Sequence, residues 1–278
     1  MSGGGLARRS VALPADHGSW VFLLTPLIVG LVAGGRWSGA SAALVVAALA
    51  GFLLRQPVTV AVKVASGRRS RGDLPAAVLW SAVYTAVGAV ALLLLVRGGF
   101  GGVLALAVPG VAIFLWYLWL VSRRDERRQL ALELLATGVL ALAAPAALWV
   151  GLGRAAPVGW LLWLLMWAQS ATSILYVYLR LEQRSWRAPR GLAARLRAAA
   201  PALVATGLFA GGTLALSAAG VVARWLFLAP AVQLGECVAG ALRPATGARP
   251  AAIGKRQLAV SALFTGVFAV AWVLGDGG

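Results

Sequence analysis

Apolar residues along this chain fall into repeated blocks, and short basic stretches separate one block from the next. Each block approaches the roughly 20 helical residues that are needed to cross the hydrocarbon core of a bilayer. The pattern therefore predicts an all-α protein, a polytopic transmembrane helical bundle that forms a single integral membrane domain over residues 1–278. The predicted spans, about nine in number, lie near residues 18–34, 38–54, 75–96, 101–121, 130–150, 158–179, 201–222, 225–242 and 257–275.

The composition excludes an ordinary soluble domain. Hydrophobic residues make up 61% of the chain and charged residues only 12%, whereas about a quarter of the residues are charged in a typical soluble protein. The formal net charge of +17 would favour nucleic-acid binding if the basic residues covered one face of a soluble domain. Here they lie between the apolar blocks, so we expect a lipid bilayer as the partner and no nucleic acid.

The basic residues also predict the orientation of the bundle. When they are divided between alternate loops, one side holds all of them except Arg36, Arg97, Arg154 and Arg224. Basic residues concentrate in the cytoplasmic loops of membrane proteins, so we expect the N-terminus in the cytoplasm, the C-terminus outside, and a location in the bacterial cytoplasmic membrane. The longer basic loops are then cytoplasmic, and they comprise residues 55–74, 180–200 and 243–256.

Small residues and prolines inside the spans predict how the helices pack. Gly30 and Gly34 lie four residues apart, as do Gly207 and Gly211, and this spacing favours close contact between helices. Prolines within spans kink helices, and such kinks could shape a cavity. The prolines concerned are Pro26, Pro145 and Pro230.

Acidic side chains are scarce, and one of them lies within a predicted span. Glu236 is in the span 225–242, where a charged side chain costs about 2.5 to 3.5 kcal/mol at the helix centre. We therefore expect it to be protonated, paired or exposed to an aqueous pocket, with Gln233 one turn away. Two alternatives stay open: a functional carboxylate, or a structural one that bonds a neighbouring helix or reaches Arg243.

A polar stripe runs down the sixth predicted span to its basic end. Gln169, Ser173, Tyr176, Arg180 and Gln183 fall within about 40 degrees of one line, at about 100 degrees per residue. The stripe either lines a cavity, where Arg180 would hold an anionic group, or forms hydrogen bonds to another helix. Because it continues into the most basic loop, we favour the cavity.

Metal and cofactor sites are not expected. One His and one Cys, Cys237, are too few for a His/Cys metal site. The sequence also has no phosphate-binding loop, dinucleotide-binding glycine motif or serine nucleophile motif. Asp16 and His17 precede the first span, and such a pair is more often a cap or an interfacial hydrogen bond than a catalyst, although His readily exchanges protons near neutral pH.

The residues around the first two spans resemble a known family of membrane proteins. The opening is similar to the HGxW-rich start of the YwiC-like family, whose members commonly have Glu at the position of Asp16; the matching residues are Asp16, His17, Gly18 and Trp20, followed by Pro26 and Gly30. Arg55, Gln56 and Pro57 after the second span, and the polar sixth span, are also similar to the family. The resemblance implies a membrane protein and assigns no reaction.

The arrangement of spans also resembles the UbiA superfamily of intramembrane prenyltransferases. The resemblance would imply an enzyme that binds a prenyl diphosphate through magnesium, which Asp-rich motifs hold in the loops after spans two and six. Here these loops are rich in arginine, and their acidic residues are Asp73 and Glu182. Two divalent ions need several carboxylate oxygens, so magnesium-dependent prenyl transfer is disfavoured.

Three functions remain open, and we favour the first. It is the binding or processing of an amphipathic, anionic, isoprenoid- or lipid-like ligand in an intramembrane cavity that faces the cytoplasm. The second is a proton-coupled transporter of a small solute, in which Glu236 couples the proton and Pro230 breaks its helix. The third is an accessory subunit that docks a respiratory or biosynthetic membrane enzyme. The candidate binding residues are Asp16, His17, Trp20, Arg55, Gln56, Gln169, Ser173, Tyr176, Arg180 and Glu236.

Overall fold

The computed structural model describes residues 9–14, 18–125, 130–188 and 190–275. In this part of the chain all regular secondary structure is helical, as the apolar blocks predict. In chain order the elements are α1 (Arg9–Ala12), α2 (Ser19–Gly34), α3 (Gly39–Ala65), the 3-10 helix η1 (Arg71–Asp73), α4 (Leu74–Arg97), the 3-10 helix η2 (Gly101–Ala107), α5 (Val108–Arg123), α6 (Leu130–Ala141), α7 (Ala143–Leu152), α8 (Val158–Arg184), α9 (Leu192–Ala218), α10 (Leu228–Leu242) and α11 (Pro250–Gly275).

Seven helical segments within the described residues are long and apolar enough to cross a membrane. They are Gly39–Ala65, Arg71–Arg97, Gly101–Arg123, Leu130–Leu152, Val158–Arg184, Leu192–Ala218 and Pro250–Gly275. The chain is therefore an integral membrane protein. The first and eighth predicted spans correspond to α2 and α10, which are shorter apolar helices, so the count of nine crossings stays a prediction.

The helices extend further into the basic segments than the sequence predicts. The prediction that residues 55–74 form a loop is wrong for the first half of this segment, because α3 continues to Ala65. Val60 and Val64 at this end of α3 are buried and pack with α1 and α4, and this apolar contact extends the helix. In the same way α8 continues to Arg184 and α11 begins at Pro250, so the links at the basic end are short.

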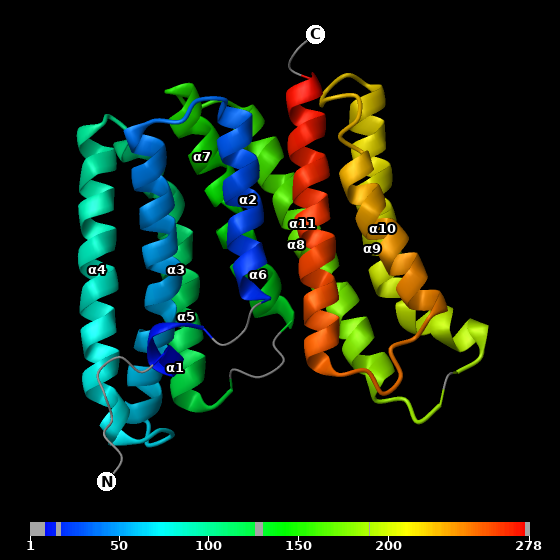
Figure 1. The fold of residues 1–278 in the computed structure, drawn as a ribbon, viewed down its shortest axis with the longest axis horizontal. Helices are drawn as coiled ribbons and strands as arrows, with labels where there is room; N and C mark the ends of the chain where they lie inside the picture. The colour runs from blue at the N-terminus through cyan, green and yellow to red at the C-terminus, as the bar shows by residue number, and fades with distance from the viewer. Residues whose placement is uncertain (1–8, 15–17, 126–129, 189, 276–278) are drawn as a thin grey trace.

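The elements stand side by side as an elongated bundle (Figure 1). One side consists of α3, α4 and α5, the middle of α2, α6, α7, α8 and α11, and the other side of α9 and α10. The main apolar core lies in the middle, where residues such as Leu162, Met166, Leu226, Phe264 and Phe268 are fully buried. Thr25 of α2 and Thr265 of α11, joined by a hydrogen bond of 2.9 Å between their hydroxyl oxygens, link the two ends of the chain inside this core.

The α2–α7 contact depends on glycine. A Cβ atom at Gly30 would overlap the carbonyl oxygen of Ala144, and one at Gly34 would lie 3.0 Å from the Cα of Gly151. The predicted packing role of Gly30 and Gly34 is thus confirmed. The same prediction is wrong for Gly207 and Gly211, since a Cβ at either would meet no atom within 4 Å. Their side of α9 is open rather than pressed against another helix.

The fifth predicted span is interrupted between α6 and α7. The helix breaks at Leu142, three residues before Pro145, whose ring nitrogen donates no backbone hydrogen bond. The indole Nε1 of Trp163 donates to the carbonyl oxygen of Gly138 at 2.8 Å. The indole Nε1 of Trp167 donates to the carbonyl oxygen of Leu134 at 2.9 Å. Within a membrane such carbonyl groups need a partner inside the protein. The tryptophans of α8 therefore stabilise the last turns of α6.

Two other prolines behave differently from Pro145. The helix α2 runs without interruption through Pro26. Pro230 lies in the first turn of α10, which begins at Leu228. A proline in the first helical turn costs no helical hydrogen bond, so the prediction that Pro230 breaks its helix is wrong. This finding removes one support of the transporter hypothesis.

The helices α3, α5, α8 and α10 end at the same end of the bundle, where α1 also lies (Figure 1). The links at this end contain most of the basic residues of the chain. Some of them bind the free carbonyl groups of these helix ends. Nη1 of Arg68 donates to Val121 in α5 at 2.7 Å, and Nη1 of Arg195 donates to Leu242 in α10 at 3.0 Å. A cation at a helix C-terminus is also favoured by the helix dipole. These arginines therefore stabilise helix ends, in addition to indicating the orientation of the bundle in the membrane.

Candidate functional site

The polar stripe of α8 faces α10, and its first part contacts Gln233. Nε2 of Gln233 lies within hydrogen-bond distance of the hydroxyl oxygens of Thr172 at 2.8 Å and Ser173 at 2.9 Å, and of the carbonyl oxygen of Gln169 at 3.2 Å. Gln169, Ser173 and Gln233 are all buried. Oε1 of Gln233 is buried without a hydrogen-bond partner among the described residues. This part of the stripe therefore forms an interhelical polar contact.

One turn further along, Tyr176 and Glu236 continue the contact. The hydroxyl group of Tyr176 donates to Oε1 of Glu236 at 2.6 Å. The phenol ring lies directly over Gly240, where a Cβ atom would overlap the tyrosine hydroxyl. The close approach of α8 and α10 at this level therefore requires glycine at position 240.

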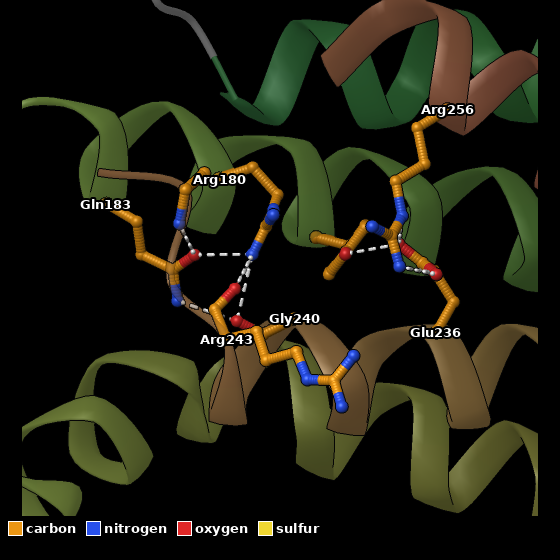
Figure 2. Close-up of polar contacts among 8 residues, drawn as sticks. Arg180, Gln183, Glu236, Gly240, Arg243 and Arg256 are labelled. Carbon is orange, nitrogen blue, oxygen red and sulfur yellow. Dashed lines mark hydrogen bonds and ion pairs between the residues drawn. The ribbon is translucent and has the colours of Figure 1, made fainter. Parts of the chain in front are cut away.

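Glu236 also binds Arg256 at the start of α11. Nε of Arg256 donates to Oε1 of Glu236 at 2.6 Å, and Nη2 donates to Oε2 at 2.8 Å (Figure 2). The side chain of Glu236 is 11% exposed, whereas that of Arg256 is 56% exposed. Bidentate guanidinium–carboxylate pairs are among the stronger hydrogen-bonded contacts in proteins. Glu236 is thus paired, one of the states expected from its sequence, with Arg256 as its cation rather than Arg243.

Arg180 and Gln183 form the last part of the stripe and bind the end of α10. Nη1 of Arg180 donates to the carbonyl oxygens of Gly240 at 2.9 Å and Arg243 at 2.8 Å, and to Oε1 of Gln183 at 2.9 Å (Figure 2). Gln183 adds a bond from its Nε2 to Gly240 and accepts one from the backbone of Ala245. Arg180 is only 9% exposed, so its positive charge is largely buried against carbonyl oxygens.

The sequence left two alternatives for the stripe, which would either line a cavity or form hydrogen bonds to another helix, and these contacts are of the second kind. The backbone carbonyl of Gln169 and the side chains of the stripe from Ser173 to Gln183 form hydrogen bonds with α10 or with the segment that follows it. In this structure the stripe is therefore engaged with a neighbouring helix. The polar contacts together form a cluster of α8, α10 and α11, which we call the polar cluster; it comprises Gln169, Ser173, Tyr176, Arg180, Gln183, Gln233, Glu236 and Arg256.

An open apolar groove lies along α11, and its lining on this helix begins at Ala262, six residues after Arg256. Its volume is about 580 Å³, and it is lined by Trp225, Leu228, Ala262, Leu263, Gly266, Val267, Val270, Ala271 and Leu274. Arg256 lies on the same side of α11 as this lining. At about 100 degrees per residue, Leu263, Val267, Val270 and Leu274 all fall within about 40 degrees of Arg256 around the helix axis. The groove therefore leads along one helix face toward the guanidinium group.

Three other predicted residues form a separate group near the start of α2. The ring of Trp20 lies 5.0 Å from that of Phe52, and the guanidinium carbon of Arg55 lies 5.0 Å from the same phenyl ring. Nη2 of Arg55 donates to the hydroxyl of Ser19, and Nε2 of Gln56 donates to the carbonyl oxygen of Ser10. These contacts join α3 to α1 and α2. Asp16 and His17 lie outside the described residues.

Acidic groups outside the cluster do not assemble into a metal site in the described chain. No three His, Cys, Asp or Glu side chains come together there in a way that could hold a metal ion. Asp73 is the N-cap residue of α4 but makes no side-chain capping hydrogen bond, and its Oδ2 accepts from Nε of Arg69 at 2.6 Å. The structure therefore uses this carboxylate in an ion pair.

Arg256 is the residue that sequence reasoning missed. In the sequence it is one of many basic residues before the last span, and 20 positions separate it from Glu236. No periodicity connects two residues on different helices. The available signal was indirect: a carboxylate inside a span needs a cation, and Arg256 stands at the boundary of the next span.

Comparison with known proteins identifies the first part of the chain. The family model described as YwiC-like protein matches residues 13–148. No curated protein and no solved structure matches the chain, so the UbiA-like resemblance stays a prediction. The match ends inside α7, and the polar cluster lies entirely beyond it. Residues 13–148 therefore resemble the YwiC-like family, as the opening residues predict.

Proposed function

We propose that this membrane protein binds an amphipathic anion, with the charged head group at Arg256 and the hydrocarbon chain in the groove between α10 and α11. The observation that carries the proposal is that Arg256 shares one face of α11 with the groove lining. A cation at the end of an apolar groove is complementary to a molecule with one anionic end. Lipids and isoprenoid phosphates have this chemistry.

The charges of the polar cluster support an anionic head group. The cluster contains two guanidinium groups, those of Arg180 and Arg256, and a single carboxylate, that of Glu236, which pairs with Arg256. Arg180 contacts carbonyl oxygens and a tyrosine ring, and the helix end supplies only about half a negative charge. The cluster therefore has an excess of positive charge. Nη1 of Arg256 makes no hydrogen bond among the described residues, and the exposed side chain can donate to a ligand.

The length of the groove supports a long hydrocarbon chain. The lining of the groove on α11 runs from Ala262 to Leu274, about 18 Å along the helix axis at about 1.5 Å per residue, and it begins about 9 Å from Arg256. This length is more than half the thickness of the hydrocarbon core of a bilayer, which is about 30 Å. Gly266 lies in the groove lining, and a Cβ atom there would meet nothing within 4 Å. The groove thus has room for a chain that runs beside α11.

Retention of copurifying molecules tests the proposal. The protein is extracted in a mild detergent, and bound anionic lipids are quantified by mass spectrometry. Arg256→Gln should lower retention about tenfold or more, since a charge-assisted hydrogen bond contributes about 1.5 to 3 kcal/mol. Gly266→Leu should lower it as well, because the new side chain fills the groove.

A matched control is available on another helix. Gly211→Leu on α9 adds the same side chain at an equally open position outside the groove, and it should retain the ligand. Retention that is equal in all three variants and in the unaltered protein would reject the proposed site.

We also propose that all nine apolar segments cross the membrane and that the basic end, including Arg256, faces the cytoplasm. The concentration of basic residues in the links at this end supports the orientation. Cysteines placed at Arg124 and at Arg154, in a chain with Cys237 replaced by Ser, test it by labelling in intact cells with a thiol reagent that does not cross membranes. Labelling is expected at position 154 only, and labelling at position 124 would reverse the orientation.

A further inference from the structure

Arg180 of α8 is a buried cation that uses only part of its hydrogen-bonding capacity. The residue is 9% exposed, and its Nη1 donates to Oε1 of Gln183 and to the carbonyl oxygens of Gly240 and Arg243. A guanidinium group has five N–H donors, and Nη1 carries two of them. Nε and Nη2 of Arg180 carry the other three, and neither makes a hydrogen bond among the described residues. More than half of the donors of this buried cation are therefore unused.

The unused donors form one edge of the guanidinium plane. The N–H of Nε and one N–H of Nη2 are parallel, and this arrangement matches two oxygens of a carboxylate or phosphate group. Both nitrogen atoms of Arg180 also remain in contact with solvent, since neither is among the enclosed polar atoms that lack a partner, whereas Oε1 of Gln233 is. The edge is therefore accessible from solvent.

The positive charge of Arg180 has no ion-pair partner among the described residues. Both oxygens of Glu236 are bound to Arg256, and Glu236 is linked to Arg180 only through the phenol of Tyr176. Glu182 is exposed and lies about 200 degrees around α8 from Arg180. The carbonyl groups at the end of α10 supply only about half a negative charge. Arg180 therefore keeps an excess of positive charge.

Burial makes this excess charge significant. A cation that is removed from water without full compensation is strongly destabilised, so buried charges in proteins normally have partners. Binding of the helix end does not require a charge, because the neutral amide of Gln183 also donates to Gly240. An ionised group within a membrane bundle that its structural contacts do not account for indicates a functional site.

We propose that the Nε/Nη2 edge of Arg180 is a second anion-binding site, which takes an oxyanion of the phosphate type through two parallel hydrogen bonds. A singly charged oxyanion compensates the charge that the helix end leaves over. The inference goes beyond the proposed function and does not rest on it, because the pair of Glu236 and Arg256 stays intact when this edge is filled. The oxyanion comes either from a dissolved phosphate ester or from a lipid head group.

Dimethyl phosphate is the probe for a dissolved anion, because it is a singly charged phosphodiester without a hydrocarbon chain. Its binding to the full-length protein in a neutral detergent is followed by the broadening of its phosphorus NMR signal. Two charge-assisted hydrogen bonds predict saturable binding with a dissociation constant on the order of 1 mM. Trimethyl phosphate, which has no charge, is the control compound and should not bind.

Three variants locate the site. Arg180→Gln should weaken the binding of dimethyl phosphate by about tenfold or more, since it removes the charge and the edge. Arg180→Lys keeps a cation beside the carbonyl groups but has no bidentate edge, and it should weaken binding by about tenfold. Arg184→Gln removes an exposed arginine one turn further along α8, and this matched control should change binding by about twofold or less.

Dihexanoyl phosphatidylglycerol, titrated in the same way, identifies the source of the oxyanion. Lipid binding that also weakens in Arg180→Gln supports the site with a lipid head group as its occupant. If only the binding of dimethyl phosphate weakens, the site is supported with a dissolved anion as its occupant. Gly266→Leu changes the groove and not the end of α8, so it should leave the binding of dimethyl phosphate unchanged even where it lowers lipid retention.

Two results would overturn the inference. One is the absence of saturable binding of both probes to the unaltered protein. The other is equal binding of both probes by the unaltered protein and the Arg180 variants, and lipid retention that still depends on Arg256 would then leave the proposed function standing alone. If Arg180→Gln does not fold, Arg180→Lys decides between the two readings.

Discussion

The α2–α7 contact and the α8–α10 contact each join two helices of the same bundle, but they use opposite means. In the first, Gly30 and Gly34 let the backbones approach until they touch, and no charged group takes part. In the second, Tyr176 and Arg180 of α8 make hydrogen bonds to α10, and Glu236 of α10 also forms an ion pair with Arg256 of α11. The first contact has one tight arrangement, whereas the second contains groups that could exchange partners.

The difference also divides the chain. The glycine-dependent contact lies almost wholly within residues 13–148, the YwiC-like part, and the polar cluster lies wholly after it. Buried polar contacts between membrane helices contribute modestly, about 0.6 kcal/mol each on average, and a buried ion pair is weak evidence for stability. We therefore place the proposed function in the α8–α10–α11 region, whereas the α2–α7 region is held by close backbone contact.

Filling the α2–α7 contact should have the largest effect on stability. In Gly30→Leu the new side chain would overlap the backbone of Ala144, and neither helix can move without disturbing the core. We expect a loss of about 3 kcal/mol, measured by denaturant unfolding of the purified protein in detergent. Gly51→Leu is the matched control, because a Cβ at Gly51 meets nothing within 4 Å. Equal unfolding curves for the two variants would contradict a tight α2–α7 contact.

Removing the buried cation of the polar cluster should have a smaller effect. Arg180→Leu leaves the carbonyl group of Arg243 without its donor and removes one of the two donors to Gly240, which should cost about 2 kcal/mol. Unfolding of the variant in detergent measures this cost, and hydrogen exchange should increase in the last turn of α10. Arg197→Leu, which removes an exposed arginine of α9, should change stability by about 0.5 kcal/mol or less. If Arg180→Leu lowered the free energy of unfolding as much as Gly30→Leu, the two contacts would not differ in their contribution to stability.

Much of the fold could be predicted because it depends on local properties of the chain. Apolar blocks predict membrane helices, and the structure has a helix in each of the nine blocks. The loops were predicted less well, because apolar side chains such as Val60 and Val64 extend helices into basic segments. The site was predicted in part. The stripe on α8 and the carboxylate on α10 were found separately, and their contact through Tyr176 was not foreseen.

The sequence by itself determined the class of the protein, the alternation of its basic links and the polar face of α8, because each follows from hydrophobicity and from the repeat of a single helix. Tertiary structure alone decided that this face meets α10, that Arg256 pairs with Glu236, and that Gly30 is packed while Gly207 is open. Tyr176 and Glu236 are 60 positions apart. Contacts of this kind depend on how whole helices pack, and no pattern within one helix specifies its neighbour.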